Sequence, residues 1–409
     1  MPSFGKLFVN VYAMYVGMPL DNVNIRVFKH NDNTLIFETV TNASGKSEVL
    51  ELPCPPMEYS LEYSSNIPKP YAQYTLEIVK HGFAAVRVAG VEILDNTIAI
   101  QNIIMSPDNG QNYGMQSIVI PDHVLYSEYP SKIPEDEVKP LLQPSGYIVL
   151  DKPVIPETIV VHNGTPDNDA AVNYYVPFTD YIKNVACCEI YSTWPTETIK
   201  ANVLSIISLT LNRVFTEWYR SMGKKFTITN STAYDQAFSY GRNIFEEISV
   251  IVDKLFATYI TKPYISQPLF TQYCDGQKVK CPEWMSQWGS KELGDKGYDH
   301  MNILRNYYGR DIYLEQAEKV SGTPVSFPGH TLQTGSAGNS VAVIQNQLNA
   351  ISSNYPEIPK LVTDGIYGLQ TEKAVKVFQK VFDMPQSGIV DFSTWYKISR
   401  IYVAVTKMA

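Results

Sequence analysis

The chain has 409 residues, of which 44% are hydrophobic and 18% are charged. This length exceeds one ordinary hydrophobic core and predicts about two to four domains in a globular rather than a disordered chain. The formal net charge of −8 argues against nucleic acid as the partner, and no apolar run approaches the roughly 18 to 20 residues of a membrane span, so we expect no membrane partner either.

Residues 1–106 have the pattern of an all-β domain. In NVNIRVFKH, apolar and polar residues alternate and place Val23, Ile25 and Val27 on one face. TVTNASGKSEVLEL predicts a strand, a turn and a strand, and YSLEY, AAVRVAGVEI and IAIQNIIM predict further strands. About six or seven short strands at hairpin spacing predict a small β-sandwich, in which we find no residues for chemistry.

Residues 107–152 differ in composition from the segments on either side. The stretches SPDNGQNYGMQ and YPSKIPEDEVKPLLQPSG are rich in proline, glycine and charge, which is typical of an exposed linker. Such a linker is either a passive spacer or a processing site. QPSGYIVLDKPVIPE is its most open stretch for a protease, and the candidate cleavage region comprises Ser145, Tyr147, Val149 and Leu150.

Residues 153–320 combine helical and strand patterns and predict a mixed α/β domain. WPTETIKANVLSIISLTLNRVFTEWYRS and MSQWGSKELGDKGYDHMNILRNYYG have helical patterns, whereas EEISVIVDKLFATYI predicts strands. Residues 328–409 follow a short linker and predict a small domain of three short helices, with Val341, Ile344, Leu348 and Ile351 facing inward. The expected fold class is multidomain α+β.

One carboxylate stands in unusual surroundings. In VACCEIY, Glu189 follows two cysteines in an otherwise apolar stretch, and an unpaired carboxylate there is costly to ionise, so its pKa should be raised. The alternative is that Glu189 caps the helix predicted to follow, because carboxylates favour helix N-termini.

The C-terminal segment carries an ordered series of motifs. They stand as Gly335-Ser336-Ala337-Gly338, Gln345 to Asn349, Asp364-Gly365-Ile366-Tyr367-Gly368 with Thr371, Phe378-Gln379, and Gly388 with Thr394-Trp395. The series resembles the type 1 peptidoglycan-binding domains. This resemblance implies binding of peptidoglycan, with Asp364 and Tyr367 as candidate contacts.

The middle segment carries three further motifs. They are Asp180-Tyr181-Ile182 with Glu189 and Trp194-Pro195; Asp235-Gln236 with Tyr240-Gly241; and Met285-Ser286-Gln287-Trp288-Gly289 with Tyr307-Tyr308-Gly309. Together they resemble the stage II sporulation protein D family of peptidoglycan lytic transglycosylases. The chain departs from the family at residues 205–208, where the family has Ala-Arg-Thr, and at Trp284, where it has glycine.

This second resemblance implies roles for the motif residues. Glu189 is the expected catalytic acid and base, and one such carboxyl group suffices for a lytic transglycosylase. Ser286 and Gln287 are expected to orient Glu189 or to bind sugar hydroxyls, with a helix cap as the alternative. Sugar contacts are expected from Tyr181, Lys200, Trp288 and Tyr308; packing is the alternative for the tyrosines, and a helical pair with Glu197 for Lys200.

The five cysteines are too few for a disulfide scaffold and leave room for at most one bridge or a metal clip. Cys274 and Cys281 lie where some family members carry zinc ligands. Zn²⁺ takes four ligands, and no histidine lies within a few residues of this pair. We therefore expect no cofactor, with a structural zinc site as the alternative.

The order of sandwich, catalytic domain and wall-binding domain resembles the clostridial spore cortex-lytic enzymes. These are made as precursors and activated in germination by removal of a propeptide, which implies a zymogen whose partners are spore cortex peptidoglycan and an activating protease. The first residues lack the pattern of a secretory signal, so we expect synthesis in the mother cell and deposition in the spore cortex or coat region. Two other functions stay open: an N-acetylmuramoyl-L-alanine amidase, and a wall-binding protein without catalysis.

Overall fold

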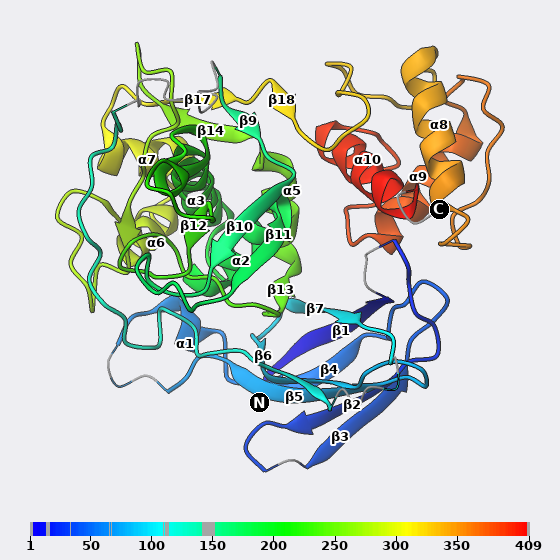
Figure 1. Cartoon of the computed structure of the whole chain (residues 1–409), viewed down its shortest axis with the longest axis horizontal. Helices are drawn as coiled ribbons and strands as arrows, with labels where there is room; N and C mark the ends of the chain where they lie inside the picture. Colours follow the sequence, from blue (N-terminus) through cyan, green and yellow to red (C-terminus); the bar gives the residue numbers. More distant parts are fainter. Residues whose placement is uncertain are drawn as a thin grey trace.

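The computed structural model describes residues 3–13, 17–32, 34–64, 66, 68–108, 110, 114–140 and 152–406. The fold combines helices with several small sheets, which confirms the mixed α and β composition expected from the sequence. Figure 1 shows a β-rich region at the bottom, a central block of helices and short strands, and three C-terminal helices to one side. Within the described ranges, no helix has both the length and the apolarity needed to span a membrane.

Two sheets make up the N-terminal β region, defined here as residues 3–119. One has the strand order β13-β7-β1-β4, in which β13 (Ile244–Phe245) comes from the central block, and the other has the order β3-β2-β5-β6-β8. The alternation around β2 is confirmed, because Val23, Ile25 and Val27 are fully buried. Not all neighbours are hairpins, since β1 pairs with β7 and β6 with β8 in parallel. The strands are β1 (Ser3–Ala13), β2 (Asn24–Lys29), β3 (Leu35–Val40), β4 (Leu50–Cys54), β5 (Ala72–Val79), β6 (Val86–Ile93), β7 (Ile98–Met105) and β8 (Gln116–Val119).

One predicted strand of this region is a helix. The YSLEY segment forms α1 (Glu58–Leu61) and its flank, not a strand. The two prolines after β4 lack the N–H groups that a sheet ladder needs, so the chain leaves the sheet there. The N–H groups of Tyr59 and Ser60 then donate to Pro56 O and Met57 O, which closes a helical turn.

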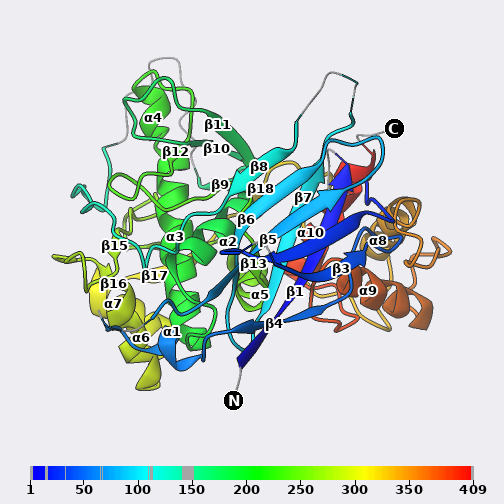
Figure 2. The same ribbon diagram turned by 90° about the horizontal axis from the view of Figure 1, so that it is seen from below.

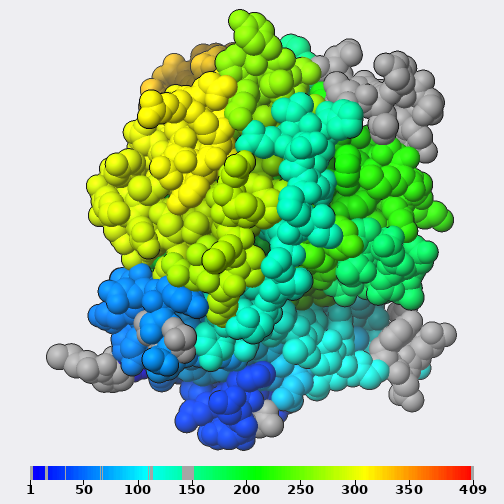
Figure 3. All heavy atoms as spheres, turned by 90° about the vertical axis from the view of Figure 1, so that its left-hand side faces the viewer, coloured from blue at the N-terminus to red at the C-terminus, as the bar shows by residue number. Residues whose placement is uncertain are grey.

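Residues 120–139, here called the strap, leave β8 and run across the central block. Figure 3 shows this part of the chain as a cyan-to-teal band lying between the yellow-green and the green parts of the block. The composition of residues 107–152 predicted an exposed linker, but β8 is part of a sheet and the strap buries Ile120, His123, Leu125, Lys132 and Lys139. The candidate cleavage residues Ser145, Tyr147, Val149 and Leu150 lie outside the described residues.

Hydrogen bonds explain why the strap is held in place. The Ile133 N–H donates to Ala233 O at 2.8 Å, and Gln272 Nε2 donates to Ile133 O at 2.8 Å. The Phe270 N–H donates to Glu137 O, also at 2.8 Å. The central block thus satisfies strap backbone groups that would otherwise need water, and this context overrides the linker-like composition.

The central block (residues 152–320) is built around the long buried helix α3, with β14 and the helices α5, α6 and α7 packed on it. The helical prediction for the first stretch is confirmed by α3, and the second stretch divides into α6 and α7. The helices are α2 (Phe178–Glu189), α3 (Thr196–Phe215), α4 (Trp218–Ser221), α5 (Glu246–Leu255), α6 (Gln287–Asp295) and α7 (His300–Tyr308). The strands are β9 (Val154–Ile155), β10 (Thr158–His162), β11 (Asn173–Pro177), β12 (Ile228–Thr229), β13 (Ile244–Phe245), β14 (Thr258–Thr261), β15 (Tyr273–Cys274), β16 (Met285–Ser286), β17 (Tyr313–Gln316) and β18 (Lys319–Val320).

The strand prediction for EEISVIVDKLFATYI is wrong over most of its length. Ten of these residues form the helix α5, and only the end forms β14. Glu246 and Glu247 occupy the first turn of α5, where carboxylates are favourable. Ile248, Ile251 and Val252 have helical spacing and are buried, so burial of one helix face outweighs the strand preference of the β-branched residues.

The C-terminal helices α8 (Asn339–Ile351), α9 (Leu369–Val381) and α10 (Phe392–Thr406) confirm the predicted three-helix pattern. The inward residues Val341, Ile344, Leu348 and Ile351 are all fully buried. Figure 2 shows these helices to one side of the N-terminal β region and the helices of the central block to the other.

The N-terminal β region contacts both of the other regions. Strand β13 of the central block pairs with β7, and a buried ion pair joins Arg242 Nη1 to Glu92 Oε2 at 2.7 Å. On the other side, Lys46 forms an ion pair with Asp383 of the C-terminal helices. The N-terminal β region is therefore an integral part of the intact chain.

Candidate active site

Glu189 is the last residue of α2 and lies inside the central block, with only 3% of its surface exposed. The Ala237 N–H donates to Glu189 Oε1 at 2.8 Å, and Gln287 Nε2 donates to Oε2 at 3.1 Å. Gln287 Nε2 also donates to Glu189 O at 3.0 Å, so it fixes both the backbone and the carboxylate. The alternative of a helix cap does not describe Glu189, because α3 begins only at Thr196, after Pro195.

The electrostatic environment of Glu189 combines opposing influences. Burial raises the pKa of this carboxyl above its ordinary value. The buried ammonium group of Lys132 opposes the rise most, followed by the hydrogen bonds from Ala237 and Gln287. The predicted upward shift of the pKa is confirmed in direction, although the surroundings of Glu189 include a cation that the apolar sequence did not indicate. A carboxyl group of this kind keeps its proton to a higher pH than an exposed glutamate, as a general acid requires.

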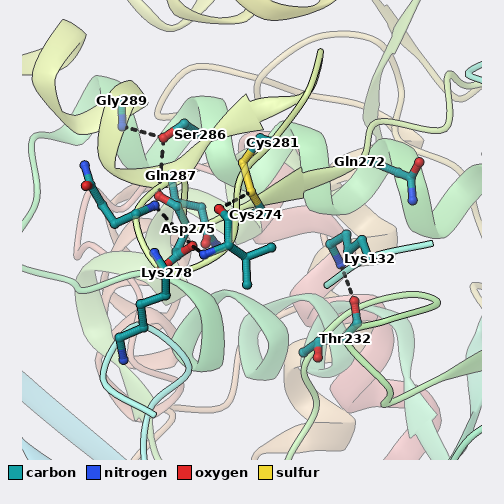
Figure 4. The surroundings of a disulfide bond; sticks show 12 residues. Lys132, Thr232, Gln272, Cys274, Asp275, Lys278, Cys281, Ser286, Gln287 and Gly289 are labelled. Atoms are coloured by element: carbon teal, nitrogen blue, oxygen red, sulfur yellow. Dashed lines mark hydrogen bonds between the residues drawn. A yellow bond between two sulfur atoms is a disulfide. The ribbon is translucent and has the colours of Figure 1, made fainter. Parts of the chain in front are cut away.

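Ser286 and Gln287 stand where β16 passes into α6. The Gly289 N–H donates to Ser286 Oγ at 2.9 Å (Figure 4), so Ser286 is the N-cap of α6. Gln287, the next residue, orients Glu189. Gly276, at φ +80°, faces Ser286, and a Cβ there would lie 1.9 Å from Ser286 Oγ. Only glycine suits this close approach.

Cys274 and Cys281 form a disulfide bond next to this turn (Figure 4). The alternative of zinc ligands is therefore wrong for this pair. Inside the closed loop, the Asp275 carboxylate accepts hydrogen bonds from three backbone N–H groups. The loop holds β15 beside β16, which positions Ser286 and Gln287. Among the described residues, no three His, Cys, Asp or Glu side chains are grouped so as to hold a metal ion.

The structure places the expected sugar contacts in different environments. Tyr181 and Tyr308 are buried, and their hydroxyls donate to acceptors within the central block at 3.1 and 2.8 Å, so their ring faces are closed to a sugar here. Lys200 Nζ forms a half-exposed ion pair with Glu197 at 2.6 Å, which is the helical pair given as the alternative. Trp288 lies in a cluster of aromatic rings beside Glu189.

The two expected contacts of the C-terminal helices have structural partners. Gln345 Nε2 and the Ile366 N–H each donate to Asp364 Oδ1 at 2.9 Å, which closes the turn before α9 and holds the pKa of Asp364 below its usual range. Tyr367 is fully buried, and its hydroxyl donates to Gly388 O at 2.9 Å. Burial therefore does not fit the expected contact between Tyr367 and peptidoglycan.

Sequence reasoning missed Lys132, the group that lowers the pKa of Glu189 most. Lys132 Nζ donates to Thr232 O at 3.0 Å (Figure 4) and to Asp235 O. It stands in YPSKIPEDEVKP, whose composition predicts a solvated segment, so no local signal marks this lysine as buried. Only the long-range course of the strap brings it to the site.

A second missed feature is a buried ionic network under the strap. Arg213 Nε donates to Asp235 Oδ1 at 2.7 Å, and Arg213 Nη2 and Nη1 donate to Glu135 of the strap at 2.6 and 3.0 Å. Asp235 also accepts hydrogen bonds from Tyr219 and Thr229. The network ties the strap to α3 by a bidentate arginine–carboxylate pair, which has a preferred geometry.

Comparisons with known proteins agree with one part of this picture. The family model described as a putative peptidoglycan binding domain matches residues 337–398, so this part of the chain is of the peptidoglycan-binding type and peptidoglycan is a supported partner. The curated proteins contain no match to the chain.

Two solved structures are similar to parts of the chain. The SleB N-terminal domain is 25% identical, with a TM-score of 0.17, and the match covers 19% of this chain and 99% of that one. The Bacillus anthracis TIE protein is 13% identical, with a TM-score of 0.18, and the match covers 28% of this chain and 20% of that one. Neither TM-score is high enough to establish a shared fold.

Proposed function

We propose that the chain is the precursor of a peptidoglycan lytic transglycosylase that acts on the spore cortex. The observation that carries this proposal is Glu189, a buried carboxyl with a raised pKa whose orientation is fixed by Gln287. The resemblance of the motifs around Glu189 and Gln287 to the stage II sporulation protein D family supports it, and the peptidoglycan-binding family match supports the substrate class.

The proposed reaction needs one carboxyl group. Protonated Glu189 gives its proton to the glycosidic oxygen between N-acetylmuramic acid and N-acetylglucosamine, and the bond from that oxygen to C1 of the muramoyl sugar breaks. The resulting carboxylate takes the proton of the muramoyl 6-hydroxyl, whose oxygen bonds to C1 and closes a 1,6-anhydro ring. Glu189 ends protonated again, and no water is consumed.

The neighbouring buried carboxylates favour a mechanism with a single acid. Asp235 accepts hydrogen bonds from Arg213, Tyr219 and Thr229. Asp275 accepts three hydrogen bonds from the backbone of its own loop. Both side chains are thereby engaged as hydrogen-bond acceptors of the surrounding structure, and Glu189 is left as the candidate proton donor.

Mass spectrometry of the products from isolated cortex peptidoglycan tests the proposed function. A lytic transglycosylase releases fragments with 1,6-anhydromuramic ends. Freed stem peptides would instead indicate an amidase, and intact glycan in the presence of bound protein would indicate a wall-binding protein. Either of these two results would overturn the proposal.

We also propose that a germination protease activates the precursor by cutting within residues 141–151, the region that contains Ser145, Tyr147, Val149 and Leu150. The position of the strap supports this, because the strap precedes the cut and carries Lys132 to Glu189. Deposition in the spore is part of the same proposal, since the substrate is there.

The C-terminal helices are expected to anchor the protein to the wall. A chain ending at Ser321 should lose at least about tenfold in binding to purified sacculi, because the peptidoglycan-binding match lies entirely beyond that residue. Sedimentation with sacculi measures the bound fraction. Circular dichroism of the shortened chain is the control for folding. It is needed because removal of the C-terminal helices uncovers Phe256, which packs on Phe392 and Tyr396. Equal sedimentation of both folded chains would show that the anchor lies elsewhere.

A further inference from the structure

Three aromatic residues form a cluster beside Glu189. The ring centroids of Trp194 and Trp288 are 5.0 Å apart, and Tyr191 lies 6.0 and 6.4 Å from them. Tyr191 and Trp194 follow Glu189 closely in the chain, and Trp288 follows Gln287, whose side chain holds the Glu189 carboxylate. The chain sequence and the Gln287 contact therefore place the cluster near the carboxyl group.

Residues from the N-terminal β region cover this cluster in the intact chain. Trp194 Nε1 donates to Ser60 O in α1 at 2.9 Å, and Ser60 Oγ lies 2.7 Å from Thr193 Oγ1. Tyr63 places its ring 6.0 Å from Trp288 in an edge-on arrangement. These contacts explain why both indoles are almost fully buried, at 3% and 5% exposed, although they lie where two regions of the chain meet.

The strap also contacts residues next to Glu189 and the aromatic cluster. The His123 ring packs against Tyr191 with centroids 4.4 Å apart and the ring planes inclined by 31°, and the Val124 N–H donates to Cys188 O at 3.3 Å. Further along, the Asp275 N–H donates to Tyr129 OH at 2.8 Å, and Lys132 brings its charge to Glu189. The strap, which turns at residues 124–127, thus makes aromatic, backbone and cationic contacts in turn.

One polar group of the cluster has no partner. Trp288 Nε1 is buried and makes no hydrogen bond within the described residues. An unsatisfied buried N–H costs about 1 to 3 kcal/mol. The residues of α1 and its flank that cover this tryptophan therefore leave its indole N–H without the acceptor that a bound ligand could provide. An amphipathic aromatic ring with a free N–H suits a sugar, which offers a flat apolar face and a rim of hydroxyl and acetamido oxygens.

We propose that Trp194 and Trp288 form a subsite for an N-acetylated sugar of the glycan strand next to Glu189, and that residues 57–63 together with the strap occupy this subsite in the intact chain. Ser60 O takes the place of a sugar oxygen at the Trp194 indole, and Lys132 takes a place near the carboxyl group. The inference rests on the proposed function for the nature of the ligand, and it deepens that function by naming the subsite and the segments that exclude the glycan.

Binding of chitotetraose, a soluble β-1,4-linked oligomer of N-acetylglucosamine, tests the subsite without any need for turnover. A recognition sequence for a specific protease replaces part of residues 141–151, and 5-fluorotryptophan resonances report on Trp194 and Trp288 before and after the cut. We expect at least tenfold tighter binding once a sizing column shows that the halves have separated. Trp288→Phe keeps the apolar ring but removes the N–H, and should weaken the binding about tenfold.

Tyr63→Ala in the uncut chain is a second test of the subsite, and it does not require the two halves of a cut chain to separate. Tyr63 is 37% exposed, so its removal should loosen the cover at little cost to folding, and weak chitotetraose binding should appear. The exposed tyrosine Tyr264 lies away from the cluster contacts, and Tyr264→Ala is the matched control, expected to leave binding unchanged.

Three results would each overturn the subsite. They are equal binding in cut and uncut chains, binding after the cut that Trp288→Phe does not weaken, and a lack of binding in both the separated cut chain and the Tyr63→Ala chain. Failure of the proposed function looks different, because the cut protein would then bind chitotetraose yet release no anhydromuramic ends from cortex.

Discussion

Replacing Glu189 by glutamine is expected to lower the rate of anhydromuropeptide release by at least about a hundredfold. Glutamine keeps the size of the side chain and an acceptor for the Ala237 N–H, but it cannot deliver a proton to the leaving oxygen. The wild-type rate should fall as pH rises through the raised pKa of Glu189, because only the protonated acid starts the reaction. Mass spectrometry of the products over a pH series, with the chain cut within residues 141–151, measures both effects.

The stability of the same variant separates a chemical role from a structural one. A carboxyl group whose pKa is raised in the folded state stabilises the fold fully below the pKa of an unfolded glutamate, and this contribution is lost as pH rises through the folded pKa. Glu189→Gln removes that dependence, so at neutral pH the variant should unfold no more easily than the wild type. Release of anhydromuropeptides at the wild-type rate by folded Glu189→Gln would rule out the assigned acid.

Replacing Arg213 by methionine is expected to lower the free energy of unfolding by about 3 to 5 kcal/mol. The Arg213 and Asp235 side chains are both fully buried and 2.7 Å apart, and Glu135 depends on the same guanidinium. The substitution leaves Asp235 without its buried cation and Glu135 with Lys139 alone, and methionine cannot supply the lost hydrogen bonds. Urea denaturation, monitored by tryptophan fluorescence, measures the change in the free energy of unfolding of the central block.

Arg220→Met is the matched control for this substitution. Arg220 follows α3 closely but is 45% exposed, and its Nη1 lies 3.5 Å from Glu217, so the loss should stay below about 1 kcal/mol. Identical midpoints for the Arg213→Met and Arg220→Met variants would show that the buried network contributes nothing to stability.

Sequence periodicity correctly predicted helices that are buried on nearly all sides. It failed for elements whose conformation depends on contacts with residues far away in the sequence. Helix α3 is buried nearly all round, so its apolar spacing was sufficient. Helix α5 has β-branched residues on its buried face, and such residues are also typical of a strand. The two glutamates in its first turn were the signal in the sequence that favours a helix. For α1, the two prolines before it were the available sign that the chain leaves the sheet.

The candidate site was predictable only in part. Glu189 and Gln287 were identified through their motif, and their 3.1 Å contact brings them together. Tyr181 and Tyr308 belong to the same motifs but support the core, because a motif records packing residues as well as reactive ones. Lys132 could not be predicted, since its burial depends on the path of a segment whose composition is that of a surface linker.

The contacts by which α1 and the strap cover the site make its accessibility depend on the effective concentration of these segments. While residues 141–151 are continuous, the cover is tethered to the site it occupies, and its effective concentration is on the order of millimolar whatever the amount of protein. A cut in that segment leaves every contact of the strap unchanged but turns the cover into a separate molecule. Whether the site is open then depends on how much of the cleaved protein is present, so under the proposed function local dilution, and not only proteolysis, would govern when catalysis starts.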